Sequence, residues 1–277
     1  MKLIRPMALT GVLLVTLTSQ SAFASAAAIA EIPNPASQFC VDVGGTLEIR
    51  KNADKSEYGV CKFDDNRVIE EWKLYRDSAF DIKKNTKLAD HLDISALYPA
   101  FHDKKLSKVN ANIARYVQGF LDQITEMQAQ DKKDGVTVNY GFYSTSEVYT
   151  SSGTVSAVLH TSYYTGGAHG APGTKVLLAT KNGEKISFRQ YIKQDAKSLK
   201  EFAKRVNTAL KAKYPDLSKE SIDLGTAPKW MNFTTVAIEN GKATVFFPAY
   251  TLGSYAEGEQ KVTVSLDGIT TMESTKK

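Results

Sequence analysis

Cysteine and histidine are scarce in this chain, which has two cysteines and four histidines among 277 residues. The spacings that build common catalytic centres are also missing: the sequence has no G-x-S-x-G turn for a serine nucleophile and no H-E-x-x-H pair for zinc. Two cysteines do not complete a structural zinc shell, and no histidine lies near them in the sequence. We therefore predict no metal site and no cofactor, and no catalytic residue is assigned from a motif.

Apolar runs long enough to span a membrane are missing as well. The run over residues 7–17 is too short for a spanning helix. Lys2 and Arg5 precede this run and Ala22-Phe23-Ala24 follows it, which is the layout of a secretory signal with its cleavage site. We predict that residues 1–24 are a cleaved signal peptide, that the protein is periplasmic or secreted, and that no transmembrane anchor remains after cleavage. A retained N-terminal anchor is the alternative.

The chain carries no strong charge of either sign. It has 35 lysines and arginines against 30 acidic residues, and its net charge of +5 falls to +3 when Lys2 and Arg5 leave with the signal peptide. The paired lysines are isolated and form no stripe: Lys83-Lys84, Lys104-Lys105 and Lys132-Lys133. We therefore expect no nucleic-acid partner. A weak preference for anionic cell-wall polymers or membranes stays open.

The two cysteines, Cys40 and Cys61, are expected to form a disulfide because an exported chain folds in an oxidising compartment. Closing a loop of that length stabilises a protein by about 3 kcal/mol. Two free thiols, or half of a metal site, are the alternatives.

Residues 32–77 are predicted to form a small module around these cysteines. Alternation in TLEIR and YGVCKF indicates two short strands, and Asp64-Asp65-Asn66 indicates a tight turn. Adjacent acids on a helix point about 100° apart, so Glu70 and Glu71 do not form one acid/base pair. We expect both to cap the helix or face solvent, and Trp72 to occupy the core of the module.

This module resembles a small secreted bacterial domain family of unknown function whose members are often labelled putative hemolysins. The residues that match its pattern in order are Asn34-Pro35-Ala36-Ser37, Cys40, Gly44-Gly45, Cys61, Glu70-Glu71-Trp72 and Tyr75-Arg76. Many members carry another cysteine before the Glu-Glu-Trp element, where this chain has Val68-Ile69. The hemolysin label implies little, because no amphipathic membrane-active segment is visible.

Residues 80–272 are predicted to form a larger domain. Apolar residues at three- and four-residue steps indicate a helix over residues 107–130, entered through the proline-broken segment LYPAF, and Asp195 is a candidate N-cap for a second helix. Strands are expected over 137–144, 146–150, 154–164, 175–180, 230–239, 242–247 and 261–266, with hairpin turns at Asn182-Gly183 and Asn240-Gly241. The predicted class is α+β: a small disulfide-bridged N-terminal module followed by a larger antiparallel-sheet domain with two packed helices.

The stretch SYYTGGAHGAPG surrounds His169 with glycines. His169 is a candidate base or metal ligand, but no partner stands at a suitable spacing; only His160, nine residues away, is near in the sequence. The interpretation that we favour is structural: Gly166, Gly167 and Gly170 shape the loop, and His169 fills a hydrogen-bonding position in it.

Two motifs in the larger domain resemble the extracellular domain of the RsiV family, anti-sigma factors whose outer domain binds lysozyme. The first is Tyr-Thr-Gly-Gly-Ala-His-Gly after a strand, followed by the segment SFRQYI. The second contains Phe233, Gly241, Phe247-Pro248, Tyr250, Gly253, Tyr255-Ala256 and Gly258. The resemblance implies an exported recognition domain. The same domain also occurs attached to peptidoglycan deacetylases, and this chain lacks the transmembrane and cytoplasmic segments of an anti-sigma factor.

Tyrosines on glycine-bounded loops suit protein recognition, because they offer area and a hydroxyl at low entropic cost. We predict a binding site made of Tyr163, Tyr164, His169, Tyr250 and Tyr255. The expected function is non-catalytic recognition of lysozyme or a similar envelope-directed protein. A peptidoglycan-binding accessory role and an envelope hydrolase using His169 are the alternatives, and packing of the tyrosines against the sheet is the purely structural one.

Overall fold

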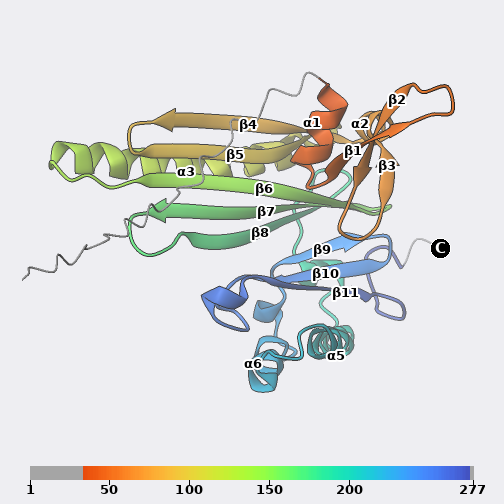
Figure 1. Cartoon of the computed structure of the whole chain (residues 1–277). Coiled ribbons are helices and arrows are strands. Elements are labelled where there is room, and N and C mark those ends of the chain that lie inside the picture. Colours follow the sequence, from red (N-terminus) through yellow and green to blue (C-terminus); the bar gives the residue numbers. More distant parts are fainter. Residues whose placement is uncertain (1–33, 275–277) are drawn as a thin grey trace, which may run out of the picture. The chain divides into compact units, whose positions relative to one another are not determined.

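The computed structural model describes residues 34–274, so the predicted signal peptide lies outside the described residues (Figure 1). The described chain is a mixed α+β structure with a disulfide-bridged N-terminal module and a larger five-stranded sheet with helices, as predicted. No helix in residues 34–274 is long and apolar enough to cross a membrane.

The N-terminal module has a three-stranded antiparallel sheet and two short helices. In chain order its elements are α1 (Pro35–Asp42), β1 (Thr46–Lys51), β2 (Glu57–Lys62), β3 (Val68–Glu70) and α2 (Glu71–Asp77). The side chain of Asn34 caps α1 by accepting the backbone N–H of Ala36 at 2.9 Å. The Asn-Pro-Ala-Ser motif therefore starts a helix.

Cys40 and Cys61 form a disulfide that ties α1 to β2, with their Cα atoms 5.6 Å apart. The prediction is confirmed, and the alternatives of free thiols or a metal site are wrong. Gly44 has a φ of 81°, and a Cβ at Gly45 would overlap with the sulfur of Cys61. The Gly-Gly pair is thus required by a turn and by close packing on the bridge.

Glu71 and Trp72 exchange the roles predicted for them. Glu70 does cap α2, but Glu71 is 4% exposed and accepts hydrogen bonds from Asn34 Nδ2 and Ser37 Oγ, whereas Trp72 is 38% exposed. A Cβ at Gly59 would overlap with the carboxyl group of Glu71. The first helix of the module therefore docks on a buried carboxylate, and sequence reasoning failed because it treated charge as a sign of exposure.

The five-stranded sheet has the order β4-β5-β6-β7-β8. Its strands are β4 (Phe80–Ala89), β5 (Leu92–Phe101), β6 (Tyr140–Thr150), β7 (Thr154–Thr165) and β8 (Ala171–Thr180). All neighbouring pairs are antiparallel except β5 and β6, which run parallel. This one pair departs from the predicted antiparallel arrangement, because the helix between β5 and β6 carries the chain back to the starting end of β5.

Two details of these strands also differ from the prediction. The LYPAF segment leads into η1 and α3 as predicted, but it is the last part of the strand β5. Its Pro99 is tolerated because β5 pairs with β6 only over Leu92–Ala96, so beyond that point one edge of β5 lacks a ladder partner. The two strands predicted over 137–144 and 146–150 are one continuous strand, β6.

A long helix, α3 (Ser107–Lys133), follows the short turn η1 (Lys104–Leu106) and packs on one face of this sheet. The predicted apolar stripe is confirmed. Its buried members are Val109, Ile113, Val117, Leu121 and Ile124.

The C-terminal part has a second three-stranded sheet, ordered β11-β10-β9, covered by helices (Figure 1). Its elements are α4 (Phe188–Tyr191), α5 (Ala196–Lys213), α6 (Lys219–Gly225), η2 (Trp230–Asn232), β9 (Val236–Glu239), β10 (Lys242–Phe247), η3 (Tyr255–Glu257) and β11 (Gln260–Ser265). Asp195 caps α5 as predicted, and the Asn240-Gly241 turn has both residues at positive φ.

This second sheet is buried on both faces. Ile238 and Val245 belong to the same apolar cluster as Phe202 and Val206 of α5. Their neighbours Ala237 and Phe246 cluster with Val158 of β7 on the other face. The backbone N–H of Ile238 also donates to Ser156 Oγ of β7 at 3.0 Å. The sheet therefore lies between α5 and the five-stranded sheet, which brings β11 and its preceding loop near β7 and β8.

Candidate functional site

The two glycine-bounded loops predicted to form a site meet in the structure. The ring of His169 stacks on Tyr255, with centroids 4.0 Å apart and planes 18° apart, and Tyr250 lies 5.9 Å from Tyr255. Tyr250 is 61% exposed and Tyr255 39% exposed. We call His169, Tyr250 and Tyr255 the aromatic patch.

The first loop, residues 165–170, joins β7 to β8 and is fixed by its glycines and by local hydrogen bonds. Gly166 and Gly167 have φ values of 86° and 108°, which only glycine adopts easily. Tyr164 Oη donates to the carbonyl of Gly167 at 2.8 Å, and His169 Nδ1 lies 2.9 Å from the carbonyl of Gly170. A histidine that donates a hydrogen bond from Nδ1 to the backbone stabilises the conformation of its loop.

The second loop, residues 248–259, is fixed just as tightly. Tyr250 sits at a φ of 70°, and Ser254 and Glu257 form a reciprocal capping box around η3. A Cβ at Gly253 would overlap with the carboxylate of Glu257. Tyr255 is therefore presented from a short rigid turn.

Two of the predicted residues stand outside the aromatic patch. Tyr164 holds the first loop through its hydroxyl, whereas Tyr163 packs against Phe120 of α3 with centroids 5.8 Å apart. Neighbouring residues of a strand point to opposite faces, so Tyr163 and Tyr164 are separated by the sheet. The side chain of Tyr163 is partly buried in the α3 layer and does not contribute to the aromatic patch.

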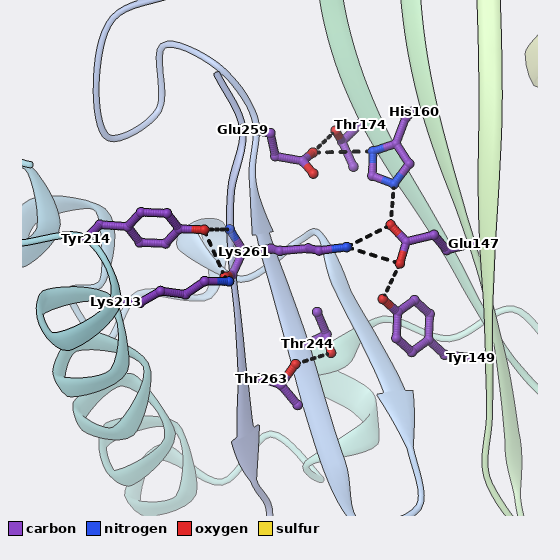
Figure 2. Close-up of polar contacts among 10 residues, drawn as sticks. All are labelled: Glu147, Tyr149, His160, Thr174, Lys213, Tyr214, Thr244, Glu259, Lys261 and Thr263. Carbon is purple, nitrogen blue, oxygen red and sulfur yellow. Dashed lines mark hydrogen bonds and ion pairs between the residues drawn. The ribbon is translucent and has the colours of Figure 1, made fainter. Parts of the chain in front are cut away.

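A network of charged side chains lies at the base of the two loops (Figure 2). His160 of β7 is held between two carboxylates: its Nε2 lies 3.0 Å from Glu147 Oε1 of β6, and its Nδ1 lies 3.5 Å from Glu259 Oε2. Lys261 of β11 reaches the same Glu147 at 3.1 Å, and Thr174 of β8 donates to Glu259. We call Glu147, His160, Glu259 and Lys261 the charge network.

Packing shields the charge network from water in part, and its side chains are between 23% and 45% exposed. The ring of Phe246 lies 5.6 Å from the ring of His160 and 6.1 Å from Tyr149, and Lys261 Nζ lies 5.7 Å from the Phe246 ring. Tyr149 Oη donates to Glu147 Oε2 at 2.5 Å. Each carboxylate thus has a partner in a partly apolar setting, where an ion pair contributes more than at an exposed surface.

The network shifts the pKa values of its members strongly. Burial alone would lower the pKa of His160, but its hydrogen bonds to Glu147 and Glu259 outweigh that effect and raise the pKa to about 9. Burial alone would raise the pKa of Glu147, but hydrogen bonds from His160 and Tyr149 and the charge of Lys261 lower it to about 2. Burial and the charge of Glu147 raise the pKa of Tyr149. At neutral pH His160 is a cation with both ring nitrogens engaged, which makes it a poor general base.

Sequence reasoning missed most of the charge network. His160 stands nine residues from His169 in the sequence, and no local pattern assigns a role to Glu147, Glu259 or Lys261. Glu147 and Lys261 are 114 residues apart in the sequence, and Thr174 and Glu259 are 85 apart, so no local spacing signals these contacts. Of residues 34–274, no group of three or more histidine, cysteine or acidic side chains is placed to hold a metal ion.

A shallow hollow of about 870 Å³ lies elsewhere, along α5 and the segments after α6 and β11. Its lining includes Lys197, Lys200, Lys204 and Asp223. None of the predicted site residues lines this hollow, which is separate from the two loops and the charge network.

Three family models match successive parts of the chain. A domain of unknown function (DUF333) matches residues 31–78, Deacetylase PdaC matches residues 82–171, and a protein of unknown function (DUF3298) matches residues 180–267. The PdaC match begins within β4 and contains β5 to β7 and His169, whereas the DUF3298 match contains Tyr250, Tyr255 and Glu259. The aromatic patch and the charge network are therefore each assembled from both matched regions.

Two solved structures are similar to the chain. A DUF3298 family protein from Pseudomonas aeruginosa has 16% sequence identity and a TM-score of 0.50, over 71% of this chain and 96% of that one. A member of the DUF3298 family from Bacteroides fragilis has 19% identity and a TM-score of 0.47, over 68% of this chain and 90% of that one. No curated protein matches the chain. The protein thus joins an N-terminal segment similar to DUF333 to a larger part similar to PdaC and DUF3298, and it shares its fold with the DUF3298 family protein from Pseudomonas aeruginosa.

Proposed function

We propose that this protein is an exported envelope protein that recognises another protein through the aromatic patch, without catalysis. The partner that we propose is lysozyme or a similar envelope-directed protein. The observation that carries the proposal is the stack of His169 on Tyr255 beside an exposed Tyr250, presented by two rigid loops.

The geometry of the patch supports protein recognition. Exposed tyrosines provide contact area and a hydroxyl with few rotatable bonds, so little entropy is lost when they are buried in a complex. Both loops are already held by glycine conformations, a capping box and the Tyr164 hydrogen bond. Preorganised loops of this kind bind without a further ordering cost.

The chemistry of the two nearby histidines supports a non-catalytic role. His169 has Nδ1 on a backbone carbonyl and its face on Tyr255, and His160 is a cation between two carboxylates. Neither is aligned on a nucleophile in the way a hydrolase requires. The similarity to PdaC and DUF3298, the N-terminal signal-like segment and the disulfide support an envelope location. The resemblance to the RsiV-type domain supports lysozyme as the partner.

The test is calorimetric titration of the mature chain, from Ser25 onward, with c-type lysozyme, with lytic activity followed in parallel. We expect a Kd in the micromolar range or tighter, which corresponds to about 8 kcal/mol. Tyr250→Ser should weaken binding about tenfold or more, because exposed aromatic anchors carry much of the energy of an interface. The matched control is Leu88→Ser, which removes an exposed apolar side chain from β4 and should leave the affinity unchanged.

Two results would overturn the proposal. Absence of heat with lysozyme, together with sedimentation of the protein with purified peptidoglycan, would make it a cell-wall accessory protein. Turnover of an envelope substrate that His169→Ala abolishes without unfolding the protein would make it an enzyme.

A further inference from the structure

We infer that Glu259 is a positioning residue that holds Tyr255 against His169. Its carboxylate contacts His160 and accepts a hydrogen bond from Thr174. The link to binding rests on the proposed function. The link to the geometry of the aromatic patch does not.

The hairpin of β7 and β8 carries His169 in its loop. His160 of β7 and Thr174 of β8 are directly paired across the two strands that lead into and out of the 165–170 loop. Both contact the same atom, Glu259 Oε2: His160 Nδ1 lies 3.5 Å away and Thr174 Oγ1 donates a hydrogen bond (Figure 2). The base of the hairpin is therefore fastened to Glu259 from both of its strands.

The segment that carries Tyr255 leads directly to Glu259. Tyr255 is the first residue of η3, and Glu259 follows it by four residues, just after Gly258 at a φ of 65°. Gln260 Nε2 donates to the carbonyls of Glu257 and Gly258 at 3.0 and 2.8 Å, which closes this turn on itself. Because this turn is short and closed by its own hydrogen bonds, fixing Glu259 in place also fixes Tyr255.

Backbone pairing does not provide this fastening. β11 pairs with β10 in the three-stranded sheet, and the strands β6, β7 and β8 belong to the other sheet. Side chains at the start of β11 therefore tie it to the five-stranded sheet, Glu259 to β7 and β8, and Lys261 to Glu147 of β6. Glu147 also accepts from His160 Nε2, which turns the opposite nitrogen of the ring toward Glu259.

Burial makes these contacts effective. The side chains of His160 and Glu259 are only 26% and 23% exposed. Partly buried ion pairs keep one geometry better than exposed pairs, because water competes less for their hydrogen bonds. Removing the negative charge of Glu259 removes its ion pair with His160 and leaves a weaker acceptor for Thr174, so the anchor that the two loops share is loosened.

The experiment uses the mature chain without any partner and follows the ring protons of His169 by NMR. Stacking on Tyr255 displaces these resonances from their unstacked positions. We expect Glu259→Gln to move them toward the unstacked values, while amide signals of α3 stay in place. The matched control is Thr263→Val, which removes the Thr244–Thr263 contact from the same strand but lies away from the loops. It should leave His169 unchanged.

Thr174→Val keeps the inference testable where Glu259→Gln fails to fold, because it removes one neutral contact to the same carboxylate. A folded Glu259→Gln or Thr174→Val protein whose His169 resonances stay at the wild-type positions would overturn the inference.

Affinity for c-type lysozyme separates this inference from the proposed function. Movement of His169 with an approximately tenfold loss of affinity in Glu259→Gln, and no loss in Thr263→Val, supports both. Movement of His169 without any change in affinity, or in a protein that does not bind lysozyme, supports the positioning role and overturns the aromatic patch as the lysozyme site.

Discussion

Single carboxylates organise two separate parts of this molecule. Glu71 is buried in the N-terminal module, where Asn34 and Ser37 bring the start of α1 onto it. Glu147 lies between the two sheets with its side chain 32% exposed, and His160, Tyr149 and Lys261 surround it. In both places several donors satisfy the carboxyl oxygens, which offsets the cost of withdrawing them from water.

The pair of Glu147 and His160 should make stability depend on pH in both directions. The folded pKa of His160, about 9, lies above that of an unfolded histidine, so its contribution is complete below pH 6.5 and is lost as the pH rises through 9. The folded pKa of Glu147, about 2, lies below the ordinary value, so its contribution is present above pH 4.5 and is lost as the pH falls through 2. Both shifts report the same ion pair and are not added.

We therefore predict that the free energy of unfolding falls by on the order of 2 kcal/mol between pH 7 and pH 10, through deprotonation of His160. The other titratable groups that face it are Glu147 and Tyr149 of β6, and Glu259 and Lys261 beside β11. Urea unfolding at the two pH values measures the effect. His160→Gln should show a smaller fall than the wild type, whereas His169→Gln should behave as the wild type does. An equal fall in His160→Gln would contradict the assignment.

At the scale of elements, α3 determines the topology of the five-stranded sheet. The chain leaves β5, crosses the sheet face as a helix and enters β6 in the same direction, which creates the one parallel pair. Its apolar stripe fixes which face of the sheet it covers, because Val117, Leu121 and Ile124 pack with residues of β5 and β6.

We predict that the stripe carries most of the stability of this layer. Ile113→Ala removes a side chain with no exposed surface and should lower the free energy of unfolding by about 3 kcal/mol, from lost burial and the cavity left behind. Met127→Ala, near the end of the same helix at 36% exposure, should lower it by less than about 1 kcal/mol. Denaturant unfolding of the two variants gives both values. Equal losses would show that the end of α3 is packed as tightly as its middle.

At the scale of the whole molecule, side-chain contacts join parts that the backbone leaves in separate sheets. Phe39 of α1 packs on Phe80 of β4 with centroids 5.6 Å apart, and Phe80 packs on Phe101 of β5. An ion pair between Lys84 and Asp42 runs alongside, at 3.3 Å. The division into a small module over 32–77 and a larger domain over 80–272 stays a proposal. Because these contacts join the two proposed parts, we expect them to unfold together.

The disulfide tests that coupling. Replacing both Cys40 and Cys61 with alanine should destabilise the protein by about 3 kcal/mol, because the bridge restricts the unfolded chain. Differential scanning calorimetry should show one transition at a lower temperature. A new, separate transition at low temperature, with the main one unmoved, would mean that the module unfolds by itself.

Local signals in the sequence determined much of this protein. The helix stripe of α3, the Asp195 cap of α5, the Asn240-Gly241 turn and the Cys40–Cys61 bridge were all predicted correctly. Each depends on a few neighbouring residues or on a rare residue type, so a short stretch of sequence contains the whole cause. The α+β class follows from such local elements taken in order.

The tertiary structure alone decided the rest. The parallel pairing of β5 with β6, the burial of Glu71 in place of Trp72, and the contact of Glu147 and His160 with Glu259 depend on segments far apart in the chain. The sequence marked the two loops as a site but not that His169 and Tyr255 would stack. The physical reason is that the free energy of a charged or aromatic side chain depends on the groups around it, and only the folded chain brings those groups together.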